Sequence, residues 1–195
     1  MAMTLDGTSG ITQMTGSIVM SGSTSGTTTI IPSAVAGTTT VTMPAATGTM
    51  MVSGNMPAFS ANTVTAQSFG SSTFTKVQYN VELFDTNSNY DPTTNYRFTP
   101  TVAGYYQINA NVGFTGSAIG FSMIAIYKNG SLYTYGSGII NNTTVGGLCV
   151  VSSVISCNGS TDYIEIYAWQ SSGGALVLQT GTGNNTFSGA MVRNA

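Results

Sequence analysis

The chain has 195 residues, of which only 5% are charged, and its formal net charge is −2. Its four cations are too few to follow a phosphate backbone, and no apolar run approaches the ~20 residues that span a bilayer. We therefore expect neither nucleic-acid binding nor membrane insertion, and the absence of histidine removes the commonest general base and zinc ligand.

The composition changes abruptly at Phe59. No Phe, Tyr or Trp precedes this residue, so all nineteen aromatic residues lie at or after it, and Asp6 is the only charged residue before Lys76. A domain core needs large apolar side chains. We therefore expect an extended, β-rich attachment and trimerisation arm over residues 1–56 and a globular head over residues 57–195.

The arm is rich in Thr, Ser and Gly, which number fourteen, six and seven in the first fifty residues. Alone, such a segment buries too little apolar surface to offset its conformational entropy. It also contains β-branched residues, which favour extended strands, and Gly26–Ile30 (GTTTI) returns after eleven residues as Gly37–Val41 (GTTTV). We interpret the repeat as two extended segments that become ordered beside sister chains or a shell. The candidate attachment residues are Ile30, Ile31, Val35 and Val41.

Alternation with a period of two marks the strands of the head. Apolar side chains occupy every second position in Val77–Leu83 and again in Tyr106–Phe114, which predicts two half-buried strands of an antiparallel sheet. Leu176–Gln179 and Thr186–Val192 predict closing strands. Together with the turns between them, about eight to ten short strands indicate a β-sandwich or jelly roll.

Two Asn-Gly pairs are strong hairpin signals. Asn129–Gly130 is one, and Asn158–Gly159 predicts a hairpin between the apolar strand that ends at Cys157 and the strand Tyr163–Trp169. Cys149 and Cys157 lie about 26 Å apart along an extended strand, whereas a disulfide needs Cα atoms within ~7 Å. We expect two unpaired thiols that act as small, buried apolar side chains.

Candidate binding chemistry is sparse. Oxygen-bearing side chains alternate, as at the start of a calcium loop, at Asp85, Asn87, Asn89 and Asp91. Tyr90 stands where such a loop needs Gly, so the alternatives are a weak calcium site and an Asx-rich turn. No Ser or Thr has a visible activating partner, and we expect no enzymatic activity, no catalytic residue and no cofactor.

An aromatic face is expected on one strand of the head. Tyr163, Tyr167 and Trp169 share that face, which Glu165 interrupts. Aromatic residues are typical both of cores and of subunit interfaces. We therefore interpret these three residues as part of the core or of a trimer interface.

The order of several motifs in the head resembles one superfamily. The most specific segment runs from Tyr90-Asp91-Pro92 through Tyr96-Arg97-Phe98-Thr99-Pro100 to Gly104-Tyr105-Tyr106, and Lys128–Gly130, Asp162–Ile164 and Thr186–Gly189 follow in order. Residues 57–195 thereby resemble the globular head of the complement C1q and tumour-necrosis-factor superfamily. The chain departs from it at Asn95-Tyr96, where relatives often carry a Gly, so this turn is expected to differ.

This resemblance implies a jelly-roll β-sandwich head that forms a homotrimer and that binds rather than catalyses. The arm is similar to the Thr/Gly/Ala-rich segments that precede such heads in bacteriophage structural proteins, for example at Pro44–Thr49. We expect a trimeric knob on the virion surface that decorates the capsid, held by the arm to capsid or tail proteins. The alternatives are a tail-fibre tip that binds a host glycan or protein, and a secreted lectin-like adhesin.

Overall fold

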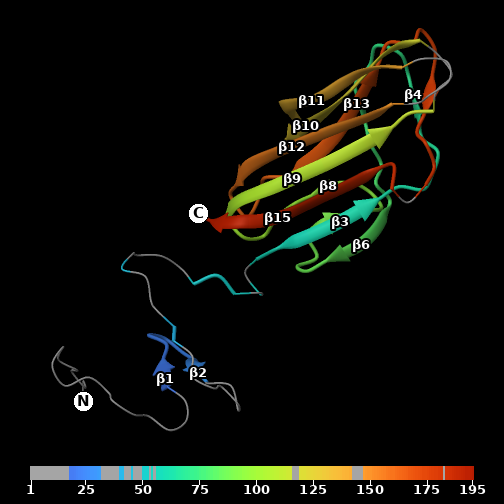
Figure 1. Cartoon of the computed structure of the whole chain (residues 1–195). Coiled ribbons are helices and arrows are strands. Elements are labelled where there is room, and N and C mark those ends of the chain that lie inside the picture. The colour runs from blue at the N-terminus through green and yellow to red at the C-terminus, as the bar shows by residue number, and fades with distance from the viewer. Residues whose placement is uncertain are drawn as a thin grey trace. The chain divides into compact units, whose positions relative to one another are not determined.

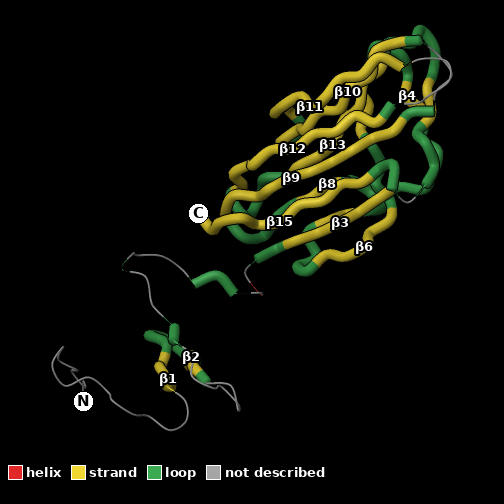
Figure 2. Tube along the Cα trace, in the orientation of Figure 1, coloured by secondary structure: helices red, strands yellow, loops and turns green. Residues whose placement is uncertain are grey.

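The computed structural model describes residues 18–31, 40–41, 45, 50–52, 54, 56–115, 119–141, 147–181 and 183–195. The chain divides into two compact units, Met1–Thr47 and Gly48–Ala195. All named elements of the described part are β-strands (Figure 1), connected by turns and loops (Figure 2). No helix among the described residues is long and apolar enough to cross a membrane. The all-β prediction is confirmed.

The described part of the first unit contains a small hairpin. Strands β1 (Ile18–Ser21) and β2 (Thr27–Ile30) pair antiparallel, with Ile18 opposite Ile30. All eight of their residues are exposed to solvent. Because an isolated two-stranded hairpin is marginally stable in water, this pair lacks the buried face that would hold it alone.

The second unit contains two large sheets and a two-stranded one. The five-stranded sheet has the order β12 (Leu148–Cys157), β9 (Gly104–Gly113), β15 (Thr186–Asn194), β3 (Ala58–Asn62), β6 (Val81–Asp85), and these strands lie side by side in Figure 1. The six-stranded sheet has the order β11 (Ser131–Asn141), β10 (Gly120–Lys128), β13 (Ile164–Gln170), β8 (Arg97–Phe98), β7 (Tyr90–Asp91), with β5 (Thr75–Lys76) also on β13. The small sheet pairs β14 (Leu176–Val177) with β4 (Ser68–Phe69).

The core lies between the two large sheets and is centred on Phe59, the first aromatic residue of the chain. Its ring stacks on Phe98 at 4.3 Å and on Tyr90 at 5.1 Å, and meets Phe187 edge-on at 4.8 Å between ring centroids. These residues come from both sheets, so the Phe59 ring of β3 contacts side chains of β7, β8 and β15. The alternating apolar residues of Tyr106–Phe114 are all buried, as predicted.

The prediction of one strand over Val77–Leu83 is wrong. Strand β5 ends at Lys76 and pairs with β13, whereas β6 begins at Val81 and pairs with β3 of the other sheet. Val77 and Tyr79 are buried as expected, but Leu83 is exposed. The chain crosses between the sheets here, and the period of two continues through the crossing, so the pattern does not reveal it.

The two Asn-Gly turns have different roles. Asn129–Gly130 joins β10 to β11 in a hairpin, and both residues have positive φ angles, 54° and 74°, as in a type I′ turn. Asn158–Gly159 joins β12 to β13, which belong to different sheets, so the predicted hairpin is wrong. Gly159 has φ 70°, and a Cβ atom there would collide with the backbone of Ala103. Glycine is needed because another chain segment passes close to this turn.

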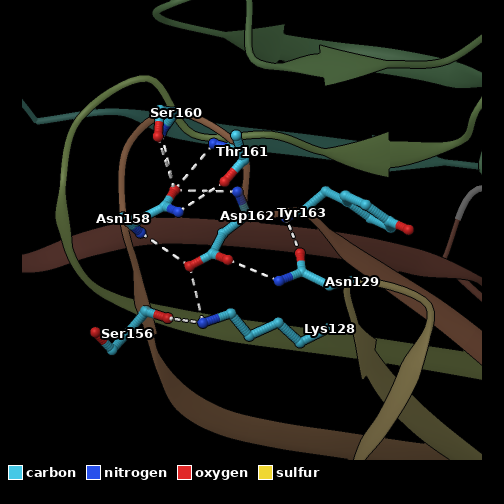
Figure 3. A network of polar contacts seen from close by, with 8 residues as sticks. All are labelled: Lys128, Asn129, Ser156, Asn158, Ser160, Thr161, Asp162 and Tyr163. Atoms are coloured by element: carbon cyan, nitrogen blue, oxygen red, sulfur yellow. Dashed lines mark hydrogen bonds and ion pairs between the residues drawn. The ribbon is translucent and has the colours of Figure 1, made fainter.

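A polar network connects the two sheets beside these turns (Figure 3). The Asp162 carboxylate accepts hydrogen bonds from Asn129 Nδ2 at 2.7 Å and Asn158 N at 3.0 Å, and lies 2.9 Å from Lys128 Nζ. Lys128, on β10, also donates to the Ser156 carbonyl of β12. The hydrogen bonds from Asn129 and then Lys128 lower the pKa of Asp162.

Candidate functional site

The segment from Asp85 to Asp91 forms a hydrogen-bonded turn. The Asp85 carboxylate accepts hydrogen bonds from Asn87 N and Tyr90 N. Asn89 Oδ1 accepts one from Thr101 N. The Asp91 carboxylate accepts backbone hydrogen bonds from residues 93–95, the largest cause of its lowered pKa. The oxygen atoms proposed for calcium thus already have partners within the chain, as in an Asx-rich turn. Among the described residues, no group of three or more His, Cys, Asp or Glu could hold a metal.

Of the three aromatic residues predicted on one strand, Tyr167 and Trp169 lie on β13 and Tyr163 directly precedes it, and all three point away from the core. Tyr163, Tyr167 and Trp169 are half-buried, while the alternate residues of β13 are buried between the sheets. The Arg97 guanidinium lies 4.2 Å from the centre of the Tyr163 ring. Glu165, on the same face, pairs with Lys76 Nζ at 2.5 Å. The structure therefore places these residues outside the sandwich core, and their role in a trimer interface stays a prediction.

Two of them belong to a larger aromatic layer on the outward face of the six-stranded sheet. The aromatic layer consists of Phe74, Phe121, Tyr127, Tyr135, Tyr167 and Trp169. The Phe74 ring lies 6.0 Å from the rings of Tyr127 and Tyr135 and 6.5 Å from Trp169, and Tyr127 stacks on Tyr167 at 4.1 Å. Burial raises the pKa of the Tyr127 and Tyr167 phenols.

Sequence reasoning missed the other four members of this layer, Phe74, Phe121, Tyr127 and Tyr135. Phe121 and Tyr127 are an even number of residues apart on β10, so alternation with a period of two predicts that they share one face of that strand. Phe74 precedes the short strand β5, and its position over the layer depends on the pairing of β5 with β13. No local pattern predicts that pairing.

Strand β12 is apolar on both faces. Its inward residues, such as Val151 and Ile155, are buried, while the outward Leu148, Val150 and Val154 are exposed by 47%, 50% and 49%. We call these three outward residues the β12 row. A strand that is apolar on both sides is typical of one covered on both sides. Within the described protomer only the inward side is covered, so the β12 row is a candidate subunit interface.

The surface beside the β12 row is polar but uncharged. On the neighbouring strand β9, Gln107 Nε2 donates a hydrogen bond to Ser152 Oγ at 2.8 Å, and Ser152 Oγ lies 2.9 Å from Asn109 Oδ1. Neither β9 nor β12 contains a charged residue. A partner that covered this surface would therefore not have to remove water from any charged side chain of β9 or β12. Charged residues are likewise depleted at the centre of protein interfaces.

The remaining predicted residues are the attachment candidates of the arm and the two cysteines. Ile30, Ile31 and Val41 are exposed, and Val35 lies outside the described residues, so the attachment role of the arm stays a prediction. Cys149 and Cys157 are unpaired and buried, as the spacing predicted. Both face the core from β12.

The head is similar to several solved structures. Eiger TNF of S. frugiperda is similar with a TM-score of 0.54 and 8% identity over 72% of this chain and 93% of that one. Murine APRIL at pH 5.0 is similar with a TM-score of 0.52 and 11% identity over 70% and 99%. The globular domain of zebrafish complement 1qA is similar with a TM-score of 0.50 and 17% identity over 71% and 98%. The head has the jelly-roll fold of these proteins. No protein-family model matches the sequence, and no similar curated protein is found.

Identities this low show the fold alone, but they agree with the resemblance drawn from Tyr90–Tyr106. In the structure Tyr90, Phe98 and Tyr106 are all buried in the core. In the turn at Asn95-Tyr96, Tyr96 has a φ of 50°, in the left-handed region that favours glycine. At this turn a tyrosine therefore adopts a backbone conformation that is strained for residues other than glycine.

Proposed function

We propose that this chain is a non-enzymatic structural protein of a bacteriophage particle. Residues 1–56 attach it to the particle, and residues 57–195 form a homotrimeric knob that decorates the capsid surface. The observation that carries the proposal is the β12 row, an exposed and uncharged apolar strip on the five-stranded sheet of a jelly-roll head. The Thr/Gly-rich arm in front of the head supports the attachment role.

Three copies of the head associate through the β12 row in this proposal. Fully burying one Val side chain contributes about 1.5–3 kcal/mol. Val150 and Val154 are half-exposed, so each contributes about 1 kcal/mol when covered. A stable contact needs about 800 Å² from each partner, so the row forms the apolar centre and the amides of β9 its polar surroundings.

The arm has the right scale for attachment to a shell. Fifty-six fully extended residues reach about 190 Å at most, and folded segments such as the β1–β2 hairpin shorten that reach. This length is short for an independent long fibre, which favours capsid decoration. Sister copies of the hairpin would supply the covering that its exposed strands lack.

Copy number in purified particles tests the placement. Quantitative mass spectrometry against the major capsid protein is expected to give hundreds of copies of this chain per particle. Its absence from purified particles would contradict the virion role altogether.

A tail-fibre tip that recognises a host surface is the second candidate. The observation that favours it is the aromatic layer, which leaves several rings accessible on the opposite side of the sandwich from the β12 row. A handful of copies per particle, instead of hundreds, would favour this candidate over decoration.

A further inference from the structure

The Phe121 ring of the aromatic layer lies against the surface of the six-stranded sheet. A Cβ atom placed on Gly138 of β11 would overlap the Phe121 ring of β10, coming within 3.0 Å of Cε1 and closer still to its neighbours. Gly138 is interior to its strand, where glycine weakens the strand and often marks a close approach. The absence of a side chain at Gly138 therefore lets the Phe121 ring settle onto the strand backbone, while 38% of the residue stays exposed.

The Phe121 ring is part of a broader aromatic surface. The Trp169 indole lies 6.4 Å from the Phe121 ring at an interplanar angle of 59°. Tyr135, which is 56% exposed, is connected to Trp169 through the Phe74 ring, which lies 6.0 Å from Tyr135 and 6.5 Å from Trp169. The rings of Phe121, Trp169 and Tyr135 stand on paired strands that the sandwich holds in place. Rigid strands position such groups more precisely than loops do.

The charges near this surface balance. β11 contains no charged residue, and the only one on β10 is Lys128 at its far end, held by Asp162. Lys76 is paired with Glu165 beside Tyr167. An anionic ligand such as a phosphorylated or sialylated chain would find no unpaired cation on β10 or β11, and Arg97 lies over Tyr163, at the other end of β13 from Trp169.

We propose that Phe121, Trp169 and Tyr135 bind a neutral oligosaccharide. The C–H face of a pyranose ring is apolar and flat, so it matches an exposed aromatic ring, while the Tyr135 hydroxyl offers a hydrogen bond to the sugar hydroxyls. The inference rests on the proposed function in one respect: a head displayed on a particle exposes the outward face of the six-stranded sheet to the surroundings. Three equal sites on one trimer would strengthen weak single contacts by avidity.

The single tryptophan provides a site-specific measurement. Trp169 is the only Trp of the chain, so tryptophan emission, excited at a wavelength that the ten Tyr do not absorb, reports on this surface. We would titrate the full chain with cellohexaose, maltohexaose, mannohexaose and chitohexaose, with a sialylated oligosaccharide as the charged comparison. At least one neutral hexaose is expected to change the Trp169 emission saturably, and the sialylated sugar is expected to leave it unchanged. No change with any neutral sugar at millimolar concentration would overturn the proposal.

Two substitutions and a matched control locate the binding. Phe121→Ala is expected to weaken binding about tenfold or more, from lost stacking and lost buried area. Gly138→Ala keeps the ring but lifts it off the strand, and is expected to weaken binding several-fold. Phe84→Ala removes a ring on β6 of the other sheet that is more exposed than Phe121, 51% against 38%, and is expected to leave binding unchanged. Binding that survives Phe121→Ala would contradict the assigned site.

Light scattering on the same samples separates this inference from the proposed function. A trimer that binds no sugar contradicts the inference and leaves the trimer intact. A monomer that binds sugar contradicts the trimer and leaves the inference intact. If Phe121→Ala dissociates the trimer, this face is an interface between copies, and the sugar site is refuted.

Discussion

Asp162→Ala is expected to lower the free energy of unfolding of the head by about 2–3 kcal/mol. The carboxylate is only 12% exposed and accepts hydrogen bonds from Asn129 Nδ2 and Asn158 N in addition to its ion pair with Lys128. Lys128 keeps its bond to the Ser156 carbonyl, but the other two donors lose their acceptor. Each unsatisfied, partly buried donor costs about 1 kcal/mol or more, and the lost ion pair adds to this. For a head of this size the melting temperature should fall by about 10 °C.

The effect of Asp162 depends on pH with a definite sign. Its hydrogen bonds hold the pKa of the folded carboxyl below the ordinary value of about 3.9. The stabilisation is therefore fully present above that ordinary pKa and is lost as the pH falls through the lower, folded value. The difference between the wild-type protein and Asp162→Ala should be constant near neutral pH and should shrink below about pH 4.

Urea unfolding at pH 7 and pH 3, at one fixed protein concentration, measures both quantities. Glu82→Ala removes the same charge from an exposed position on β6 and serves as the matched control, with an expected change within about 0.5 kcal/mol. A loss below about 0.5 kcal/mol for Asp162→Ala at pH 7 would show that the Asp162 network does not stabilise the head. A difference in unfolding free energy between the wild type and Asp162→Ala that is the same at pH 3 and pH 7 would show that the Asp162 charge is not its cause.

Three further predictions concern the core, the thiols and the acidic turn. Phe59→Ala removes the ring that contacts Phe98, Tyr90 and Phe187, and should cost about 3–5 kcal/mol by denaturant titration, whereas a cost below 1 kcal/mol would show that the ring is not central. Both thiols are buried, and burial raises the pKa of each to about 11, so alkylation followed by intact mass should add two groups only after denaturation without reductant. Rapid reaction of the native protein would contradict this burial. Millimolar calcium should leave the melting temperature unchanged because the oxygen atoms near Asp91 already accept hydrogen bonds, and a clear rise would instead support a calcium site.

The sequence predicted the core strands where one face is polar. In Tyr106–Phe114 every second residue is polar, so the inward set was identified correctly. In Leu148–Cys157 the apolar residues occupy both faces, and alternation cannot separate those that fill the core from those left exposed. The β12 row was therefore missed, although a strand apolar on both faces was itself a signal for a second covered side.

Connections between sheets were the other source of error. Residues 77–80 carry the chain from β5 to β6, and Asn158–Gly159 carries it from β12 to β13. Local turn chemistry and period-two patterns are the same whether the next strand pairs in the same sheet or in the other one. The prediction of the aromatic layer was incomplete for a similar reason, because Phe74 joins the layer only through the long-range pairing of β5 with β13.

Light scattering on the full chain and on Val154→Asp tests whether three chains associate through the β12 row. The wild-type protein is expected to have about three times the 20.1 kDa mass of one chain at micromolar concentration. Val154→Asp places a charge on the row and should give a folded monomer, while Val64→Asp, at an exposed position away from β12, should remain a trimer. A wild-type monomer, or a Val154→Asp trimer as stable as the wild type, would show that the chains do not associate through the β12 row.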